Sequence, residues 1–196
     1  NTKHEFTTLT EYNKPIKAIQ NIVIEKNIEL IVMGSQGATR SRKVAYGSTS
    51  IYVMEKVREC PAIIVPEDAN YDIPKEIVFP TSHKVAYKTK ELKPLIDLAK
   101  KTNANIAVLH VDNNEDTTKN KQLLETSLSE VKYSYHLLSN YEIETAITIF
   151  AESRGSDIIA FVNKKHSFFG STFNQPLVKG LGFYSKIPIL TMHTIE

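Results

Sequence analysis

The residues best suited to chemistry lie between Ile31 and Ser50, in the stretch IVMGSQGATRSRKVAYGSTS. Gly34 and Gly37 follow an apolar run, and nine residues separate Gly37 from the pair Gly47-Ser48. Glycine lets backbone N–H groups approach a ligand, because no Cβ stands in the way. The pair Gly47-Ser48 precedes a helical pattern, and the free N–H groups at a helix start suit an anion. This spacing is compatible with a phosphate cradle.

Two further features of the stretch support the cradle, but a second interpretation stays open. Thr49 adds a hydroxyl donor, and the run from Arg40 to Lys43 adds basic side chains. The pattern is neither a P-loop, because Gly-Lys-Ser/Thr is missing, nor the dinucleotide fingerprint, because the third glycine comes too late. In a purely structural interpretation Gly34 forms a strand-end turn and Ser48 is an ordinary N-cap. Spacing and physics alone do not choose between the two.

The elements around this stretch alternate between strands and helices. After Glu29, residues 30–34 are wholly apolar, so residues 29–34 are predicted to form a strand buried on both faces of a parallel sheet. Ile16, Ile19 and Val23 share one helical face, and Pro15 suits a first helical turn. In this part of the chain we expect strands at 5–12, 29–34 and 62–66, and helices at 14–27 and from 47 onward.

The alternation restarts after a polar linker at residues 67–75. Strands alternating with helices imply parallel βαβ units, so the predicted class is α/β, with helices on both faces of a parallel sheet. We expect strands at 76–80, 105–111, 133–138, 157–162 and 187–192, a polar loop at 112–120, and helices marked by Leu92-Leu95-Ile96-Ala99, Leu124-Leu128-Val131, Ile143-Ala146-Ile147-Phe150-Ala151 and residues 175–182.

The chain also contains an internal repeat. Residues 29–34 correspond to 157–162 at an offset of 128, and residues 60–66 correspond to 187–193 at an offset of 127. The predicted domains are therefore the C-terminal part of a first copy at 1–70 and a complete second copy at 71–196. If both copies share one architecture, the first lacks roughly 54 residues, or two βα units.

The missing units have a physical consequence. With a strand order of 3-2-1-4-5, the missing strands lie between residues 5–12 and residues 29–34. We therefore expect the chain to be a fragment without its N-terminal portion; strand exchange with another chain is the other way to complete the sheet.

Composition restricts the class of protein. The formal net charge is only +2, from 24 basic and 22 acidic residues, which predicts no nucleic-acid partner. No apolar run approaches the roughly 18 residues of a membrane span, and no signal peptide is visible. The single cysteine, Cys60, forms no intrachain disulfide and is expected to be a buried, inert thiol. These features predict a cytoplasmic protein.

Catalytic and metal-binding patterns are absent from the sequence. The six histidines are scattered, and no pair has the i, i+4 spacing of a helical metal site. No Gly-x-Ser-x-Gly elbow and no Cys/His nucleophile arrangement occurs. The run Lys164–Ser167 is interpreted as a solvated loop, and the three phenylalanines within 166–173 suggest packing or an interface. We therefore expect no catalytic residue, no metal ligand and no enzymatic activity.

The stretch MGSQGATRSRKVAYGSTS, with the following VRECPAIIVPE, resembles the universal stress protein family. Nucleotide-binding members carry the motif G-x2-G-x9-G-[S/T], which the glycines at 34, 37 and 47 and Ser48 match at every position. The resemblance covers the chain as one and a half tandem copies. It implies five parallel strands, an adenine nucleotide as ligand, and pairing of the two copies with each other. The nucleotide site that it implies consists of Met33, Gly34, Gly37, Gly47, Ser48 and Thr49.

The second copy departs from the family pattern. No two glycines lie three apart after residue 162, and Gly170-Ser171 comes too soon after the strand. Ser82 stands where binding members usually have an aspartate that helps to hold the adenine or a metal. We therefore expect no nucleotide at the second copy. The strand that would carry the corresponding aspartate of the first copy is not in this sequence.

Two functions follow from these observations. The first is a stress-response regulator that binds ATP or AMP, with or without Mg²⁺, at the first copy, and whose hydrolysis of ATP is slow and incidental. The second is a module that binds no nucleotide and uses the same fold for interaction, with intramolecular pairing, a homodimer or strand exchange. The intact glycine spacing favours the first function, and the degenerate second copy favours the second.

Overall fold

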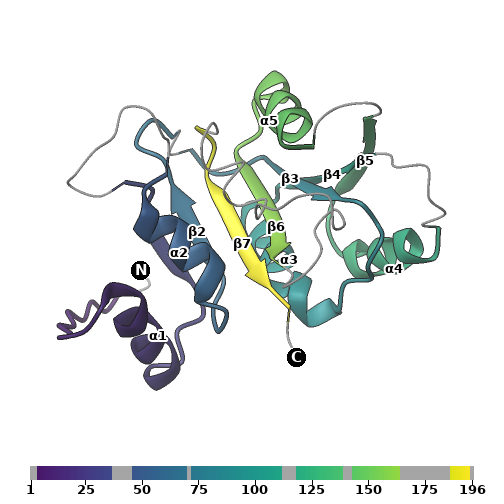
Figure 1. Ribbon diagram of the computed structural model, residues 1–196. Coiled ribbons are helices and arrows are strands. Elements are labelled where there is room, and N and C mark those ends of the chain that lie inside the picture. Colours follow the sequence, from purple (N-terminus) through teal and green to yellow (C-terminus); the bar gives the residue numbers. More distant parts are fainter. Residues whose placement is uncertain are drawn as a thin grey trace.

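The computed structural model describes residues 4–36, 46–69, 72–111, 118–138, 143–163 and 186–194. Within this part of the chain, seven strands form one sheet, and five helices lie on its two faces (Figure 1). The strands are β1 (Ile31–Gly34), β2 (Ala62–Val65), β3 (Glu76–Thr81), β4 (Asn105–Val111), β5 (Tyr133–Leu138), β6 (Ile158–Asn163) and β7 (Ile189–His193). The helices are α1 (Pro15–Glu25), α2 (Ser48–Lys56), α3 (Thr89–Thr102), α4 (Thr118–Leu128) and α5 (Ile143–Arg154).

The strand order is β1-β2-β7-β6-β3-β4-β5. All neighbouring strands are parallel except β2 and β7, which pair antiparallel with Ile63 opposite Leu190. The five strands from β3 to β7 have the order 3-2-1-4-5 in their own sequence numbering, which confirms the α/β class and the order used above. The division into domains at 1–70 and 71–196 stays a prediction.

Each face of the sheet has its own apolar core, because successive side chains of a strand point to opposite faces. Along β6, Ile159 and Phe161 join the core under α1, α2 and α5, whereas Ile158, Ala160 and Val162 join the core under α3 and α4. The predicted apolar face of α3 is confirmed, because all four of its marked residues are buried. The core under α1, α2 and α5 contains residues from both sides of position 70, so this core is shared across the chain.

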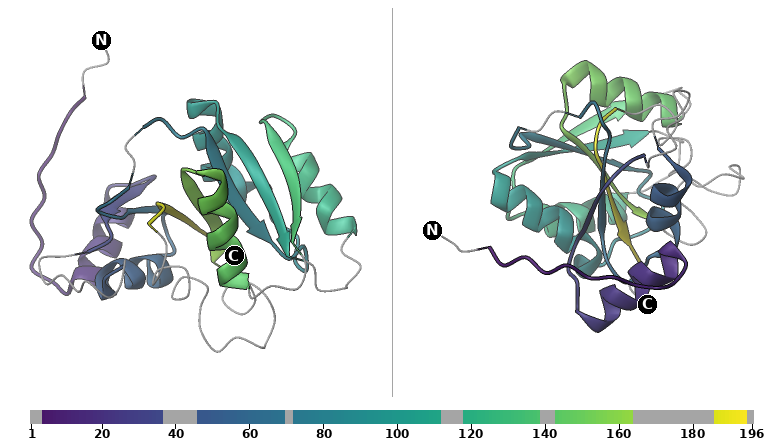
Figure 2. Two further views of the ribbon diagram at one scale, coloured as in Figure 1. Left: turned by 90° about the horizontal axis from the view of Figure 1, so that it is seen from above. Right: turned by 90° about the vertical axis from the view of Figure 1, so that its left-hand side faces the viewer.

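The strand expected at residues 5–12 is wrong. Residues 4–12 have no regular secondary structure, and Phe6 and Tyr12 are 92% and 106% exposed. Figure 2 shows the purple segment before α1 extending away from the sheet. The physical reason is that a strand requires a hydrogen-bonding neighbour, and no described strand lies beside this segment.

The expectation that β1 is buried on both faces is also wrong. Its residues alternate between intermediate and exposed, and Val32 is 63% exposed. Because β1 is the first strand in the sheet order, only β2 pairs with it among the described strands. By comparison, β6 is flanked by β7 and β3, and five of its six residues are buried.

Two smaller differences concern segment ends. The polar loop expected at 112–120 is helical from Thr118, where α4 begins, and Val131 lies beyond the end of α4. The helix expected at 175–182 lies outside the described residues.

Among the helices described here, none combines the length and the apolar character needed to cross a membrane.

The buried hydroxyl of Thr191 in β7 gives a first testable prediction. Thr191 is 0% exposed, and its Oγ1 has no hydrogen-bond partner among the described residues. Burying an unpaired hydroxyl costs about 1–3 kcal/mol, so Thr191→Val should raise the free energy of unfolding by about 1 kcal/mol. Thermal unfolding should shift upward by about 2–4 °C. Thr126→Val on exposed α4 is the control; a lower melting temperature for Thr191→Val would show that this hydroxyl has a partner.

Candidate functional site

The end of β1 and the start of α2 meet at Ser35, where two hydrogen bonds join them and a third ties Ser35 to β2. The Ser35 N–H donates to the Val65 carbonyl at 2.9 Å, which fixes Ser35 at the end of the β1–β2 pair. The Ser35 carbonyl then accepts from the Gly47 N–H at 2.7 Å and from the Ser50 hydroxyl at 2.7 Å. Residues on the two sides of the 37–45 segment are thereby brought into contact.

The structure therefore brings together five of the six residues predicted to hold a nucleotide. Met33 and Gly34 end β1, Gly47 is the N-cap of α2, and Ser48 and Thr49 are its first helical residues. The sixth residue, Gly37, lies outside the described residues, as do the basic side chains at positions 40, 42 and 43.

Gly34 has no conformational need to be glycine. Its φ lies outside the left-handed region, since Gly155 is the glycine with positive φ among those described. A Cβ added at Gly34 would meet its nearest atom, the Gln36 carbonyl oxygen, at 3.9 Å, which is ordinary van der Waals contact. Gly34 ends β1, but neither a left-handed φ nor a close contact with another described residue requires glycine there.

The start of α2 is open to solvent and carries no acidic group. Gly47 is the N-cap with φ −78° and ψ 165°, a conformation that any residue adopts, and no side chain caps the helix. Ser48 is the first helical residue rather than the N-cap of the purely structural interpretation, and Ser48 and Thr49 are exposed. The first N–H groups of a helix have no partner within the helix, and here no carboxylate of the first turn competes for them. The arrangement suits an anion.

Met33 differs from the other members of the set. Its side chain is partly buried and packs against the apolar core under α1, α2 and α5. Successive strand residues alternate in direction, so Met33 and Gly34 face opposite sides of β1. A contact between the Met33 side chain and a nucleotide stays a prediction.

Sequence reasoning did not single out Ser35, Tyr46 and Ser50. Ser35 and Ser50 are 2% exposed, and the bond between them joins the residues on the two sides of the 37–45 segment. Tyr46 is 1% exposed, and its hydroxyl donates to the Ile187 carbonyl at 2.9 Å. Only the position of Tyr46 directly before the third glycine of the motif hinted at a role. Its partner, 141 residues away, has no signature in the local sequence.

The carboxyl ends of β3 and β4 carry imidazole and hydroxyl groups. Ser82, which follows the end of β3, is buried. The His83 N–H donates to Thr81 Oγ1 at 3.1 Å, and His83 has a left-handed φ of 55°. Its ring centroid lies 4.8 Å from that of His110, whose Nδ1 is 3.1 Å from the Thr81 carbonyl oxygen.

His83 is neutral at pH 7. Burial, followed by the nearby His110 and Lys121, lowers the pKa of its imidazole to about 4. Its two ring nitrogens have no hydrogen-bond partner among the described residues. In the described ranges, no group of three or more His, Cys, Asp or Glu side chains could hold a metal ion.

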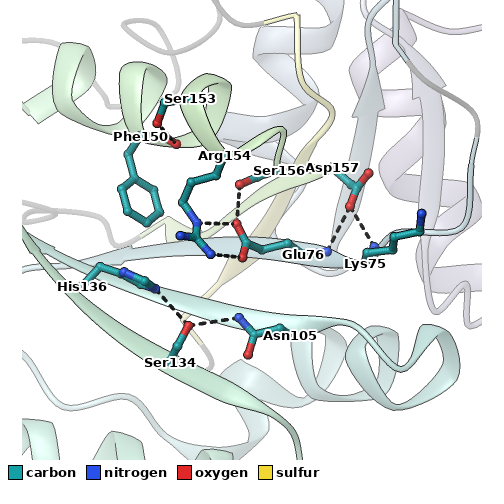
Figure 3. Close-up of polar contacts among 10 residues, drawn as sticks. All are labelled: Lys75, Glu76, Asn105, Ser134, His136, Phe150, Ser153, Arg154, Ser156 and Asp157. Atoms are coloured by element: carbon teal, nitrogen blue, oxygen red, sulfur yellow. Dashed lines mark hydrogen bonds and ion pairs between the residues drawn. The ribbon is translucent and has the colours of Figure 1, made fainter.

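A second polar network lies at the opposite edge of the sheet, where β3 begins (Figure 3). The Glu76 carboxylate accepts from Arg154 Nε at 2.8 Å and from the Ser156 hydroxyl at 2.7 Å. The Asp157 carboxylate accepts from the backbone N–H groups of Lys75 and Glu76 at 2.8 and 3.0 Å. These bonds join the end of α5 to the start of β3, and their role is structural.

Cys60 lies between α2 and β2 as a free, buried thiol. Burial raises its pKa to about 11, so the reactive thiolate is scarce at neutral pH. We predict that the native protein reacts with a maleimide at least tenfold more slowly than the urea-unfolded protein does, counted by mass spectrometry. Equal rates would show that Cys60 is accessible in the folded state.

Comparisons with known proteins bear on this geometry. Residues 2–66 match the model of the Universal stress protein family. A universal stress protein from Archaeoglobus fulgidus DSM 4304 is 20% identical with a TM-score of 0.66, and the match covers 90% of this chain and 66% of that one. A functionally unknown protein from Pseudomonas aeruginosa PAO1 and a putative universal stress protein from Pseudomonas aeruginosa UCBPP-PA14 are each 10% identical, with TM-scores of 0.65 and 0.64, over 93% of this chain and 69% of theirs. No curated protein matches the chain.

Proposed function

We propose that the chain binds ATP or AMP at the junction of β1 and α2. The match of residues 2–66 to the model of the Universal stress protein family supports this proposal. In this proposal the phosphates lie against Gly34 and the first N–H groups of α2, with the hydroxyls of Ser48 and Thr49 as further donors. The protein acts as a cytoplasmic regulator of a stress response, and binding rather than turnover is its activity.

The observation that carries the proposal is the conformation of Gly34. Glycine in a strand costs stability relative to residues with a side chain, so it persists where the fold or a ligand requires it. Here φ is not left-handed, and a Cβ would have room among the residues that the structure describes. What lies outside the protein, at the exposed end of β1, therefore explains the missing side chain best.

The start of α2 supports the same conclusion independently. The helix has nine residues, no side-chain cap and no acidic residue in its first turn. Most helix starts in proteins are capped by a side chain, which satisfies one of the free N–H groups. Leaving this start uncapped, beside exposed hydroxyl groups, preserves donors for an anionic ligand.

The test compares two glycine-to-alanine substitutions by calorimetric titration with ATP. Gly34→Ala should weaken ATP binding about tenfold or more, because the new Cβ occupies ligand space, while the melting temperature does not fall and can rise slightly, since alanine in a strand costs less than glycine. Gly155→Ala should lower the melting temperature and leave ATP binding unchanged. Its φ of 64° is strained for alanine, which lowers the free energy of unfolding by about 1 kcal/mol without affecting ATP.

Three outcomes contradict the proposal. If the wild-type chain binds neither ATP nor AMP at millimolar concentration, nucleotide binding is wrong for this chain, and the interaction module becomes the better function. If Gly34→Ala binds as tightly as the wild type, the nucleotide lies elsewhere. If Gly155→Ala weakens binding as much as Gly34→Ala does, the loss reflects general destabilisation.

A further inference from the structure

Helix α2 is hydrogen-bonded near both of its ends to the part of the chain that follows residue 150. Immediately before its start, the hydroxyl of Tyr46 donates to the Ile187 carbonyl at 2.9 Å, two residues before β7. Near its end, the Met54 carbonyl accepts from Nδ2 of Asn163, the last residue of β6, at 3.1 Å. Two neighbouring strands, β6 and β7, thus provide one anchor each.

Packing reinforces these two bonds. Val53 and Met54 of α2 are 0% exposed and belong to the same apolar core as Phe161 of β6 and Ile189 of β7. Tyr46 is among the largest fully buried side chains described, so its ring is held by this core while its hydroxyl reaches the Ile187 carbonyl. In the order β2-β7-β6, β7 lies next to β2 and β6 lies next to β7, as Figure 1 shows.

The contacts of α2 with the first part of the chain leave its start dependent on these anchors. Its end is bonded to α1 through Gln20, whose Nε2 donates to the Lys56 carbonyl at 3.0 Å. Its start is bonded to the end of β1 through the Ser35 carbonyl, which accepts from Gly47 and Ser50. The position of the first helical N–H groups is therefore set jointly by the Ser35 carbonyl and by Tyr46.

We propose that Tyr46 and Asn163 are positioning residues, through which β6 and β7 hold the start of α2 in the geometry that binds phosphate. This inference rests on the proposed function of the β1–α2 junction. Donors to a phosphate must lie within a few tenths of an ångström of their ideal positions, so small shifts of the helix start weaken binding. By linkage, nucleotide binding stabilises the α2–β6–β7 contacts by the same factor.

The first experiment compares two tyrosine-to-phenylalanine substitutions that each remove one hydroxyl. Tyr46→Phe removes the bond to Ile187, and the control Tyr87→Phe removes a bond of 3.2 Å to Thr81 Oγ1 at the end of β3. Both should lower the melting temperature by a similar few degrees. Only Tyr46→Phe should weaken ATP binding, by about fivefold.

The ligand series separates positioning from a merely structural effect. Because α2 is proposed to hold phosphates, Tyr46→Phe should weaken ATP more than adenosine, whereas general destabilisation weakens both equally. Asn163→Ala removes the other anchor and should likewise weaken ATP binding more than adenosine binding. This second variant keeps the inference testable if Tyr46→Phe does not fold.

The outcomes distinguish the two proposals. If wild-type protein binds ATP and both anchor variants retain wild-type affinity, or lose ATP and adenosine equally, the positioning role is wrong and the proposed function stands. If the wild type binds no ATP, both fail. A selective loss of ATP affinity in both anchor variants, with Tyr87→Phe unaffected, supports the inference.

Discussion

Replacing Phe161 with alanine should lower the free energy of unfolding by about 4 kcal/mol, because a large buried ring is removed and a cavity is left. Phe161 is 1% exposed in the middle of β6 and belongs to the core shared by α1, α2 and α5. Its neighbour in β7 is Thr191, and β6 has strands on both sides. The surroundings are therefore fixed on every side and collapse little into the cavity.

Urea unfolding followed by circular dichroism measures this loss, with Ile149→Ala as the matched control. Ile149 lies on α5 at 54% exposure, so its truncation should cost less than about 0.5 kcal/mol. Since the core around Phe161 joins α2 to β6, the variant should still unfold in one transition. A loss below about 1 kcal/mol, or two separate transitions, would contradict this description of the core.

The strands of the second part were predictable because their local sequence and their surroundings agree. Residues 158–162 are an apolar run, and β6 is buried between β7 and β3. The helical period at Leu92 and Leu95 was equally clear, since both side chains lie in one core. In these segments the residue pattern is the direct result of burial, so it reveals the element.

The same reasoning failed at residues 5–12 and at β1, because burial depends on a neighbour that the local pattern does not contain. Residues 29–34 read like residues 157–162, yet β1 has one strand partner among the described strands and β6 has two. Val32, on this edge strand, is exposed. The local residue pattern indicates which environment a segment suits, but whether that environment forms depends on the segments that pack against it.

The residues of the candidate site likewise fall into those that the local sequence revealed and those that it did not. Gly34, Gly47 and Ser48 were found from spacing, because a cradle needs small residues and a helix start close together in the chain. Tyr46 and Asn163 were missed, because their partners, Ile187 and the Met54 carbonyl, are 141 and 109 residues away. Contacts over such separations become visible only when the order of the strands is known.

Replacing Arg154 with methionine should lower the free energy of unfolding at pH 7 by about 2 kcal/mol, because it leaves the Glu76 carboxylate without its cationic partner. The Glu76 side chain is 16% exposed and that of Arg154 is 38% exposed, so the pair lies between a surface pair and a buried one. Lys93→Met breaks the exposed Lys93–Asp97 pair on α3 and should cost less than about 0.5 kcal/mol.

The pH dependence of that loss identifies its cause. The hydrogen bond from Arg154, followed in importance by that from Ser156, holds the pKa of Glu76 below its ordinary value of 4.5, against the opposing effect of burial. A lowered pKa in the folded state gives stability that is present above about pH 4.5 and is lost as the pH falls through the folded value. Wild-type protein should therefore lose stability over this acidic range more steeply than Arg154→Met does, so that the two unfolding curves converge toward pH 3. If the difference between them is the same at pH 3 and pH 7, Arg154 stabilises the start of β3 through packing on Phe150, whose ring centroid lies 5.4 Å from its guanidinium, rather than through its charge.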